Sequence, residues 1–206
     1  MTTTASVDSE SFWVGATPPD LVLTLASSVD LATVSSVTAS MRDAAGSAVT
    51  GLAGVLDAAA SSVTVSFPAD PFTVKGIYTL QLTLQLPSAT EPVEPVQLVI
   101  QQDDGWLTLQ QARDMWPQAP DDDVTLTMLL DSARVACEHF APALTEGAQV
   151  PVNYRQAQFQ QARASWLAMS ATTDSRIGDD NFSITVFPLD WHVKQLLRPR
   201  GIPVMY

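Results

Sequence analysis

Cysteine and histidine are scarce in this chain of 206 residues, which has one cysteine, Cys137, and two histidines, His139 and His192. A single thiol excludes a disulfide framework within the chain and a zinc site of four thiolates. Two histidines leave few of the nitrogen ligands that most transition-metal sites use. We therefore expect no metal site and no bound cofactor.

Basic residues are also few. Lys and Arg number 10 against 22 Asp and Glu, which gives a net charge of −12. Proteins bind phosphate backbones through Lys and Arg, so a surface this acidic repels double-stranded DNA. Charged residues make up only 16% of the chain and apolar residues 46%, which is typical of a folded protein and the reverse of a disordered one.

Long apolar runs are absent. No stretch approaches the roughly 20 apolar residues that cross a bilayer, so we expect no membrane-spanning segment. The segment Met1–Glu10 has neither a basic n-region nor an apolar h-region, which argues against a secretory signal peptide.

Motifs for catalysis are missing as well. The chain has no G-x-S-x-G nucleophile elbow and no glycine-rich phosphate loop. Cys137 and His139 diverge if they lie on a helix, and the apolar spacing around Cys137 favours a core residue. The run Asp121–Asp123 lacks the alternate spacing and the glycine of a calcium loop, and a helix start explains it better. We therefore expect no enzymatic activity.

Residues 1–103 have the pattern of a β domain. Apolar and polar residues alternate in Leu21–Leu25, Val63–Phe67 and Ile77–Leu86, which is typical of strands with one buried face. Segments rich in proline, glycine and aspartate separate these runs. The spacing predicts an antiparallel β-sandwich of the immunoglobulin-like kind.

Residues 104–206 have the pattern of a small helical domain. Thr108 and Gln111 fit a capping box, and Pro117 ends the short helix that follows. A second helix begins at Asp121–Asp123 and ends at Pro142. Its apolar positions recur at helical spacing: Leu126, Leu129, Leu130, Ala133, Ala136, Cys137 and Phe140.

The pattern then predicts a third helix from about Pro151 to about Ser170. A strand follows over Phe182–Phe187, and a short helix over Asp190–Leu197 that Pro199 ends. The apolar face expected for the third helix comprises Tyr154, Ala157, Ala162, Trp166 and Met169. Together the two halves predict an α+β protein of two domains, divided at about Gln102 to Gly105.

Four of the five tryptophans lie in the second half: Trp106, Trp116, Trp166 and Trp191. Core packing accounts for most of them. Because Trp and Arg are enriched at protein interfaces, one or two are expected to anchor a contact between subunits. The candidates are Trp166 and Trp191, with Arg163.

Three segments of the second half carry a family resemblance: Trp106–Ala112, then Leu126–Ala133 with Glu138–Phe140, and Val186–Arg200. They resemble the head-to-tail adaptor (head–tail connector) family of long-tailed bacteriophages over about residues 104–203. The family's fold is a small bundle of helices with a strand or hairpin excursion. The residue patterns predict the same order of elements.

The resemblance implies a structural virion protein at the neck of the particle, located in the host cytoplasm during assembly. Copies are expected to form a twelve-fold ring on the portal protein, to meet a stopper or tail-side neck protein, and to extend the DNA channel. The family's portal-docking arm maps onto Arg198, Pro199, Arg200, Ile202, Pro203, Val204, Met205 and Tyr206. A tail that packs on its own helix is the alternative for this segment.

The acidic balance fits such a channel, because negative walls let DNA pass without specific binding. The candidate channel-lining acids are Asp121, Asp122, Asp123, Asp179 and Asp180. A minimal adaptor lacks a β domain of this size, and the capsid is a candidate partner for the β half. Two other interpretations stay open: another virion interaction protein (baseplate, stopper or decoration protein), and an enzyme or small-molecule binder.

Overall fold

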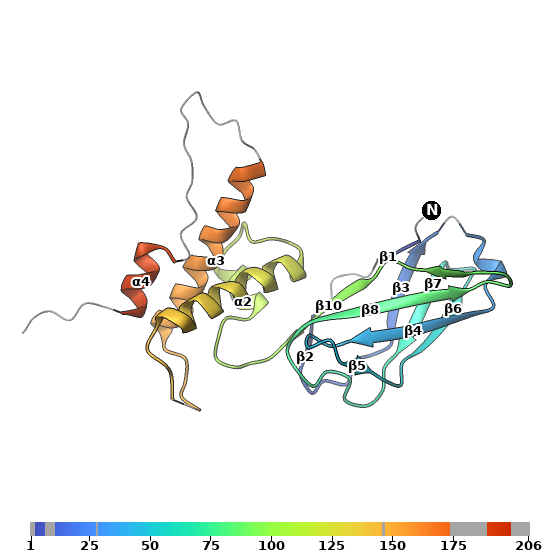
Figure 1. Ribbon diagram of the computed structural model, residues 1–206, viewed down its shortest axis with the longest axis horizontal. Coiled ribbons are helices and arrows are strands. Elements are labelled where there is room, and N and C mark those ends of the chain that lie inside the picture. Colours follow the sequence, from blue (N-terminus) through green and yellow to red (C-terminus); the bar gives the residue numbers. More distant parts are fainter. Residues whose placement is uncertain (1–2, 7–10, 28, 146, 174–188, 199–206) are drawn as a thin grey trace, which may run out of the picture. The chain divides into compact units, whose positions relative to one another are not determined.

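The computed structural model describes the chain except for residues 1–2, 7–10, 28, 146, 174–188 and 199–206 (Figure 1). It divides into two compact units, Met1–Gln102 and Asp103–Tyr206, and each is described by itself. In its described residues, the first unit contains strands and one 3-10 turn and is called the β unit. The described residues of the second unit contain helices, and it is called the helical unit. The protein therefore belongs to the α+β class.

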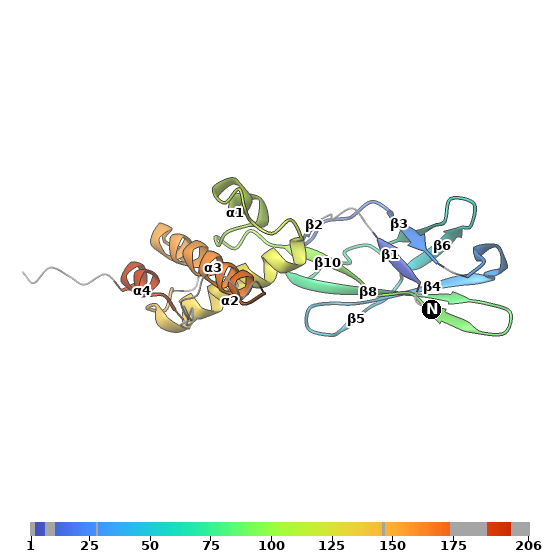
Figure 2. The same ribbon diagram turned by 90° about the horizontal axis from the view of Figure 1, so that it is seen from above.

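The described part of the β unit is one curled mixed sheet (Figures 1 and 2). The strand order is β1-β3-β7-β6-β4-β8-β10-β2, with β5 paired to β4 and β9 paired to β8. The strands are β1 Thr4–Ser6, β2 Ser11–Trp13, β3 Leu21–Ala26, β4 Ser36–Arg42, β5 Ala48–Val49, β6 Ala53–Asp57, β7 Ser62–Ser66, β8 Gly76–Gln85, β9 Thr90–Pro92 and β10 Val96–Gln101, and the 3-10 turn η1 is Leu31–Thr33.

The expectation of a wholly antiparallel sheet is wrong at one edge. β2 pairs with β10 in parallel, with Phe12 opposite Ile100, whereas the other pairs of named strands are antiparallel. A parallel pair needs a crossover between its strands, and most of the β unit lies between these two. The direction of the pair therefore depends on distant parts of the chain.

The predicted alternation of strand residues is confirmed. Leu21, Leu23 and Leu25 are buried, whereas Val22 between them is 57% exposed. In β8 the buried residues are Tyr78, Leu80, Leu82 and Leu84, one face of the strand. These side chains belong to one hydrophobic core that draws on strands from both ends of the strand order.

An aromatic group fills one part of this core. Phe72 is fully buried, and its ring centroid lies 5.1 Å from that of Phe12, 5.6 Å from that of Phe67 and 5.6 Å from that of Tyr78. The Tyr78 ring meets it edge-on, a favourable geometry for aromatic pairs. The Tyr78 hydroxyl donates to the carbonyl oxygen of Val74 at 3.0 Å, so burial leaves no polar atom of this ring unpaired.

The helical unit contains α1 Leu109–Met115, α2 Asp123–Phe140, α3 Val152–Thr173 and α4 Trp191–Leu197. The capping box predicted at Thr108 and Gln111 is confirmed, since each side chain bonds to the backbone of the other residue. Asp122 is the N-cap of α2, and Asp190 is the N-cap of α4. The strand predicted over residues 182–187 lies outside the described residues.

The buried face of α3 differs in part from the expected one. Tyr154, Ala157 and Ala162 are buried as predicted, but Met169 is 54% exposed. The amides Gln158 and Gln161 are buried instead, at 1% and 5% exposure. An apolar stripe could not reveal them, because glutamine is counted among the polar residues that normally face solvent.

Polar side chains of α3 connect the helices of this unit. Gln158 Nε2 donates to the Leu130 carbonyl of α2 at 3.1 Å, and its Oε1 accepts from the Leu107 N–H at 3.1 Å. Asn153 Nδ2 donates to the Leu196 carbonyl of α4 at 2.8 Å. Helices of seven residues are not stable alone, so these bonds help to hold α4, and the chain entering α1, in place.

Candidate assembly surfaces

α4 is fixed at both ends and exposes a tryptophan. The Asp190 N–H donates to Gln161 Oε1 at 3.3 Å, which fixes the start of the helix, and Asn153 fixes its end. Val193 and Leu197 are buried, whereas Trp191 is 64% exposed. An exposed tryptophan on a well-anchored helix is a typical hot spot for protein contacts.

The other two predicted interface residues lie on α3. Arg163 is exposed, and its guanidinium carbon lies 5.5 Å from the Phe159 ring centroid. Trp166, one turn further along, is half-buried. Both follow Gln161, the residue that holds the start of α4. Of the remaining tryptophans in this unit, Trp106 and Trp116 are core residues.

Arg198 is the described residue of the predicted docking arm, whose other members lie outside the described residues. It forms the C-cap of α4, and its guanidinium carbon lies 4.9 Å from the centroid of the Phe140 ring at the end of α2. This contact has cation–π geometry. The arm therefore starts from a helix that is secured to α2 and α3.

The acidic run at the start of α2 has three different environments. Asp121 is exposed. Asp122 accepts from the Thr125 N–H at 2.7 Å, and its hydrogen bonds to Thr125 hold its pKa below the usual value. Asp123 is 7% exposed and pairs with Arg113 at 2.6 Å. The expectation of an exposed channel acid is therefore wrong for Asp123, because its carboxylate neutralises a cation of α1. Asp179 and Asp180 lie outside the described residues.

A charge cluster that the sequence patterns did not predict surrounds Arg134 on α2. Its guanidinium pairs with Asp104 and, at 2.8 Å, with Glu138, and it lies 5.2 Å from the Trp106 ring centroid. Partial burial alone would lower the pKa of Arg134, but the hydrogen bonds to the two carboxylates raise it. The spacing of Arg134 and Glu138, four residues apart on a helix, was the available sequence signal.

Cys137 is a core residue, as the sequence predicts. Its side chain is fully buried, and burial, with the neighbouring charge of Glu138, raises the pKa of the thiol to about 12. Nucleophilic cysteines instead have a depressed pKa and an accessible sulfur. Across the described ranges no group of three or more His, Cys, Asp or Glu side chains comes together as a metal site would require.

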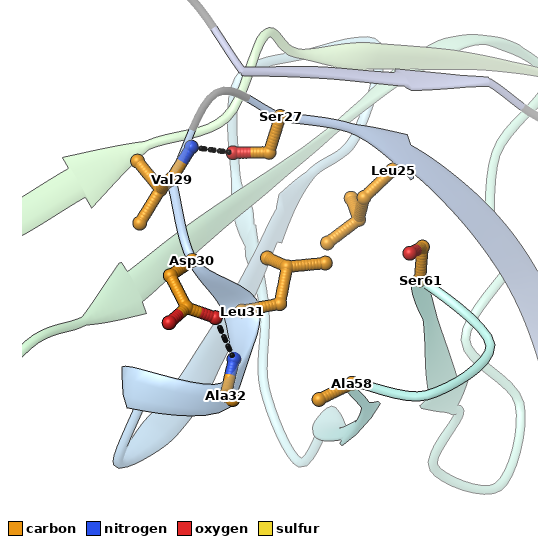
Figure 3. A pocket seen from close by; sticks show the side chains of 8 residues that line it. All are labelled: Leu25, Ser27, Val29, Asp30, Leu31, Ala32, Ala58 and Ser61. Carbon is orange, nitrogen blue, oxygen red and sulfur yellow. Dashed lines mark hydrogen bonds between the residues drawn. The ribbon is translucent and has the colours of Figure 1, made fainter.

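A shallow hollow of about 280 Å³ lies at one end of the β unit, beside η1 (Figure 3). Two of its polar side chains, Ser27 and Asp30, are engaged within the loop. Ser27 Oγ accepts from the Val29 N–H at 3.0 Å, and Asp30 Oδ1 accepts from the Ala32 N–H at 3.0 Å. These bonds shape the loop itself, and the hollow shows no convergent set of free polar groups of the kind that orients a ligand.

None of the helices in the described part of the chain has the length and apolar character needed to cross a bilayer.

Comparison with known proteins gives little. No protein-family model matches the chain, and no curated protein matches it. Among solved structures it is similar to CopC from Methylosinus trichosporium OB3b, with 16% sequence identity and a TM-score of 0.34, over 51% of this chain and 99% of that one. A likeness at this TM-score carries no argument about fold or function.

Proposed function

We propose that this protein is a structural component of a bacteriophage virion, a head-to-tail adaptor that forms a ring on the portal. The observation that carries the proposal is Trp191, 64% exposed on a short helix that Gln161 and Asn153 fix to the bundle. The same helix leads directly into the C-terminal arm. An exposed tryptophan on a helix fixed at both ends suits attachment to a large partner.

The order of helices in the described residues supports the proposal. The segments on which the resemblance to adaptors rests correspond to α1, α2 and α4, each with a side-chain N-cap. Proposed partners are the portal protein, a stopper or tail-side neck protein, and further copies of this chain in a twelve-fold ring. DNA would pass without specific binding, beside acids that include Asp121 and Asp122.

For the β unit we propose an immunoglobulin-like sandwich that contacts the capsid or braces neighbouring subunits. The strand order supports this assignment. The succession β1-β3-β7-β6 followed by β4-β8-β10-β2 corresponds to the immunoglobulin sheets ABED and CFG, with β2 added in parallel beside the last strand. A single residue pair, Val37 with Gly54, joins β4 to β6, so the two sets of strands meet at a narrow junction.

Co-sedimentation with the portal assembly encoded in the same genome tests the adaptor proposal. Full-length protein is compared with a truncation that ends at Leu197. Binding of the full-length protein alone supports both the adaptor function and the docking arm. Binding of both supports the adaptor function and refutes the arm. Binding of neither refutes the portal contact and favours a baseplate or decoration role.

A further inference from the structure

Two faces of the helical unit are at least partly exposed, and charges of opposite sign lie on or beside them. The first, the α2 seam, consists of Met128, Ser132, Val135 and His139. Met128 is 60% exposed and Val135 50% exposed. Their spacing of four, three and four residues is that of a seam along which another helix packs. It lies opposite the buried residues of α2, and the described residues leave it uncovered.

The second, the α4 face, consists of Trp191, Lys194, Gln195 and Arg198. These positions follow i, i+3, i+4 and i+7, so they share one side of the helix. Val193 and Leu197 lie on the other side and are buried. The α4 face is about 10 Å long and the α2 seam about 17 Å long, at the usual rise per residue.

The charges of the two faces are opposite. Two acids, Asp131 and Glu138, flank the α2 seam, and Glu138 also pairs with Arg134 of the same helix at 2.8 Å. Asp131 and Glu138 lie along the same side of the seam. The α4 face itself carries two cations, Lys194 and Arg198.

We propose that the α4 face of one copy docks on the α2 seam of another copy, with Trp191 against Met128 and Val135 and with Lys194 beside the acids that flank the seam. A second copy is the occupant that the charges favour. The chain as a whole carries −12, so copies repel each other unless they meet through oppositely charged faces. The contact joins two different surfaces and is therefore head-to-tail. Its closure into a ring rests on the proposed function.

Disulfide cross-linking distinguishes a head-to-tail contact from a symmetric one. Ser132→Cys and Gln195→Cys are prepared as separate full-length proteins. The native Cys137 is fully buried and gives little background. We expect linked dimers to form in the mixture of the two and not in either alone. A control mixture replaces Gln195→Cys with Val152→Cys, an exposed site outside both faces.

Equal cross-linking in the control mixture overturns the proposal, as does cross-linking of one variant with itself alone. If the cross-link fails while the full-length protein still sediments with the portal assembly, the contact is wrong and the adaptor function stands. If the cross-link forms without portal binding, the adaptor function fails and the contact stands.

Sedimentation velocity measures how strongly copies of the chain associate. Trp191→Ala is expected to weaken self-association about 30-fold, the effect of a hot-spot residue, whereas Trp13→Ala, at an exposed tryptophan of the β unit, leaves it unchanged. Ser132→Lys weakens association by placing a cation opposite Lys194, and Lys194→Glu in the same chain restores it. Loss without restoration, in variants with native circular dichroism, contradicts the proposed pairing.

Discussion

The β unit is stabilised by a continuous apolar core, whereas the helical unit depends on buried polar side chains that join one helix to another. In the first, Phe72 packs against three aromatic rings, and backbone ladders fix the strands. In the second, Gln158 bonds to the backbone at both Leu107 and Leu130. Long strands can align through their own backbone groups, but short helices satisfy those groups internally and need side chains to fix their positions.

The two units also differ in how charged side chains are placed on their surfaces. The outward residues of β4 and β8 are mainly Ser, Thr and Gln, with Arg42 as the charged exception along these two strands. The helical unit instead carries acids along α2 and cations on α3 and α4. Charges of opposite sign on separate faces give direction to association. We therefore place the self-contact in the helical unit.

The largest expected effect concerns the chain's single thiol, which lies in the helical unit. The pKa of Cys137 is about 12 in the folded protein, against 9.0 for the free thiol. At pH 8 the thiolate fraction, and with it the rate of reaction with a thiol reagent, should be about a thousandfold lower in the folded than in the unfolded protein. Rapid labelling of the native protein would contradict the buried site.

The same shift has a consequence for stability. Folding raises the pKa of this thiol, so the folded state holds the proton more tightly than the unfolded state does. Its contribution is fully present below about pH 9 and is lost as the pH rises toward 12. The free energy of unfolding at several pH values, measured for the native protein and for Cys137→Ala, gives this contribution.

Phe72→Ala should destabilise the β unit by about 3–5 kcal/mol, because it leaves a cavity among Phe12, Phe67 and Tyr78. Denaturant unfolding followed by Trp13, the only tryptophan of this unit, measures the change. Labelling of Cys137 follows the helical unit in the same samples and should not change. Equal shifts in both signals would show that the two units unfold together.

Gln158→Leu should destabilise the helical unit by about 1–3 kcal/mol, since a buried Leu107 N–H loses its acceptor while the volume stays similar. The helical circular dichroism signal in denaturant measures it. Gln156→Leu, on the exposed side of the same helix, is the matched control and should change stability by less than about 0.5 kcal/mol. Equal effects of the two would mean that the amide bridge contributes nothing.

Asp122→Ala should have the smallest effect, about 1 kcal/mol, through loss of the α2 N-cap. The pKa of Asp122 is lowered by its hydrogen bonds to Thr125, so its stabilisation is present above the ordinary carboxyl range near pH 4 and is lost as the pH falls through the lowered value. Asp121→Ala, at an exposed site that is not the cap residue, serves as the control and should change stability less. Thermal unfolding of both variants at pH 7 and at pH 2 distinguishes loss of the N-cap from loss of an exposed acid.

Local patterns predicted α1 to α4 and the strands β3, β7 and β8. The alternation in Leu21–Leu25 and in Ile77–Leu86 marked strands with the correct buried face, and the caps at Thr108 and in the Asp121–Asp123 run marked helix starts. Each of these signals involves residues a few positions apart, where backbone geometry fixes the side-chain directions. Of the candidate site, the sequence indicated Trp191 and Arg163, but it treated the buried Asp123 and the exposed Asp121 alike.

The sequence by itself determined the α+β class, the positions of the helices and of strands β3, β7 and β8, and the strongly acidic charge, because these follow from composition and short-range periodicity. Only the tertiary structure decided the parallel pairing of β2 with β10, the burial of Asp123 against Arg113 and of Gln158 between helices, and the exposure of Trp191 while Trp106 became core. Each of these outcomes depends on which distant segment packs against the residue. A local pattern carries no information about that choice, because the same tryptophan or carboxylate is stable either in solvent or beside a partner that satisfies it.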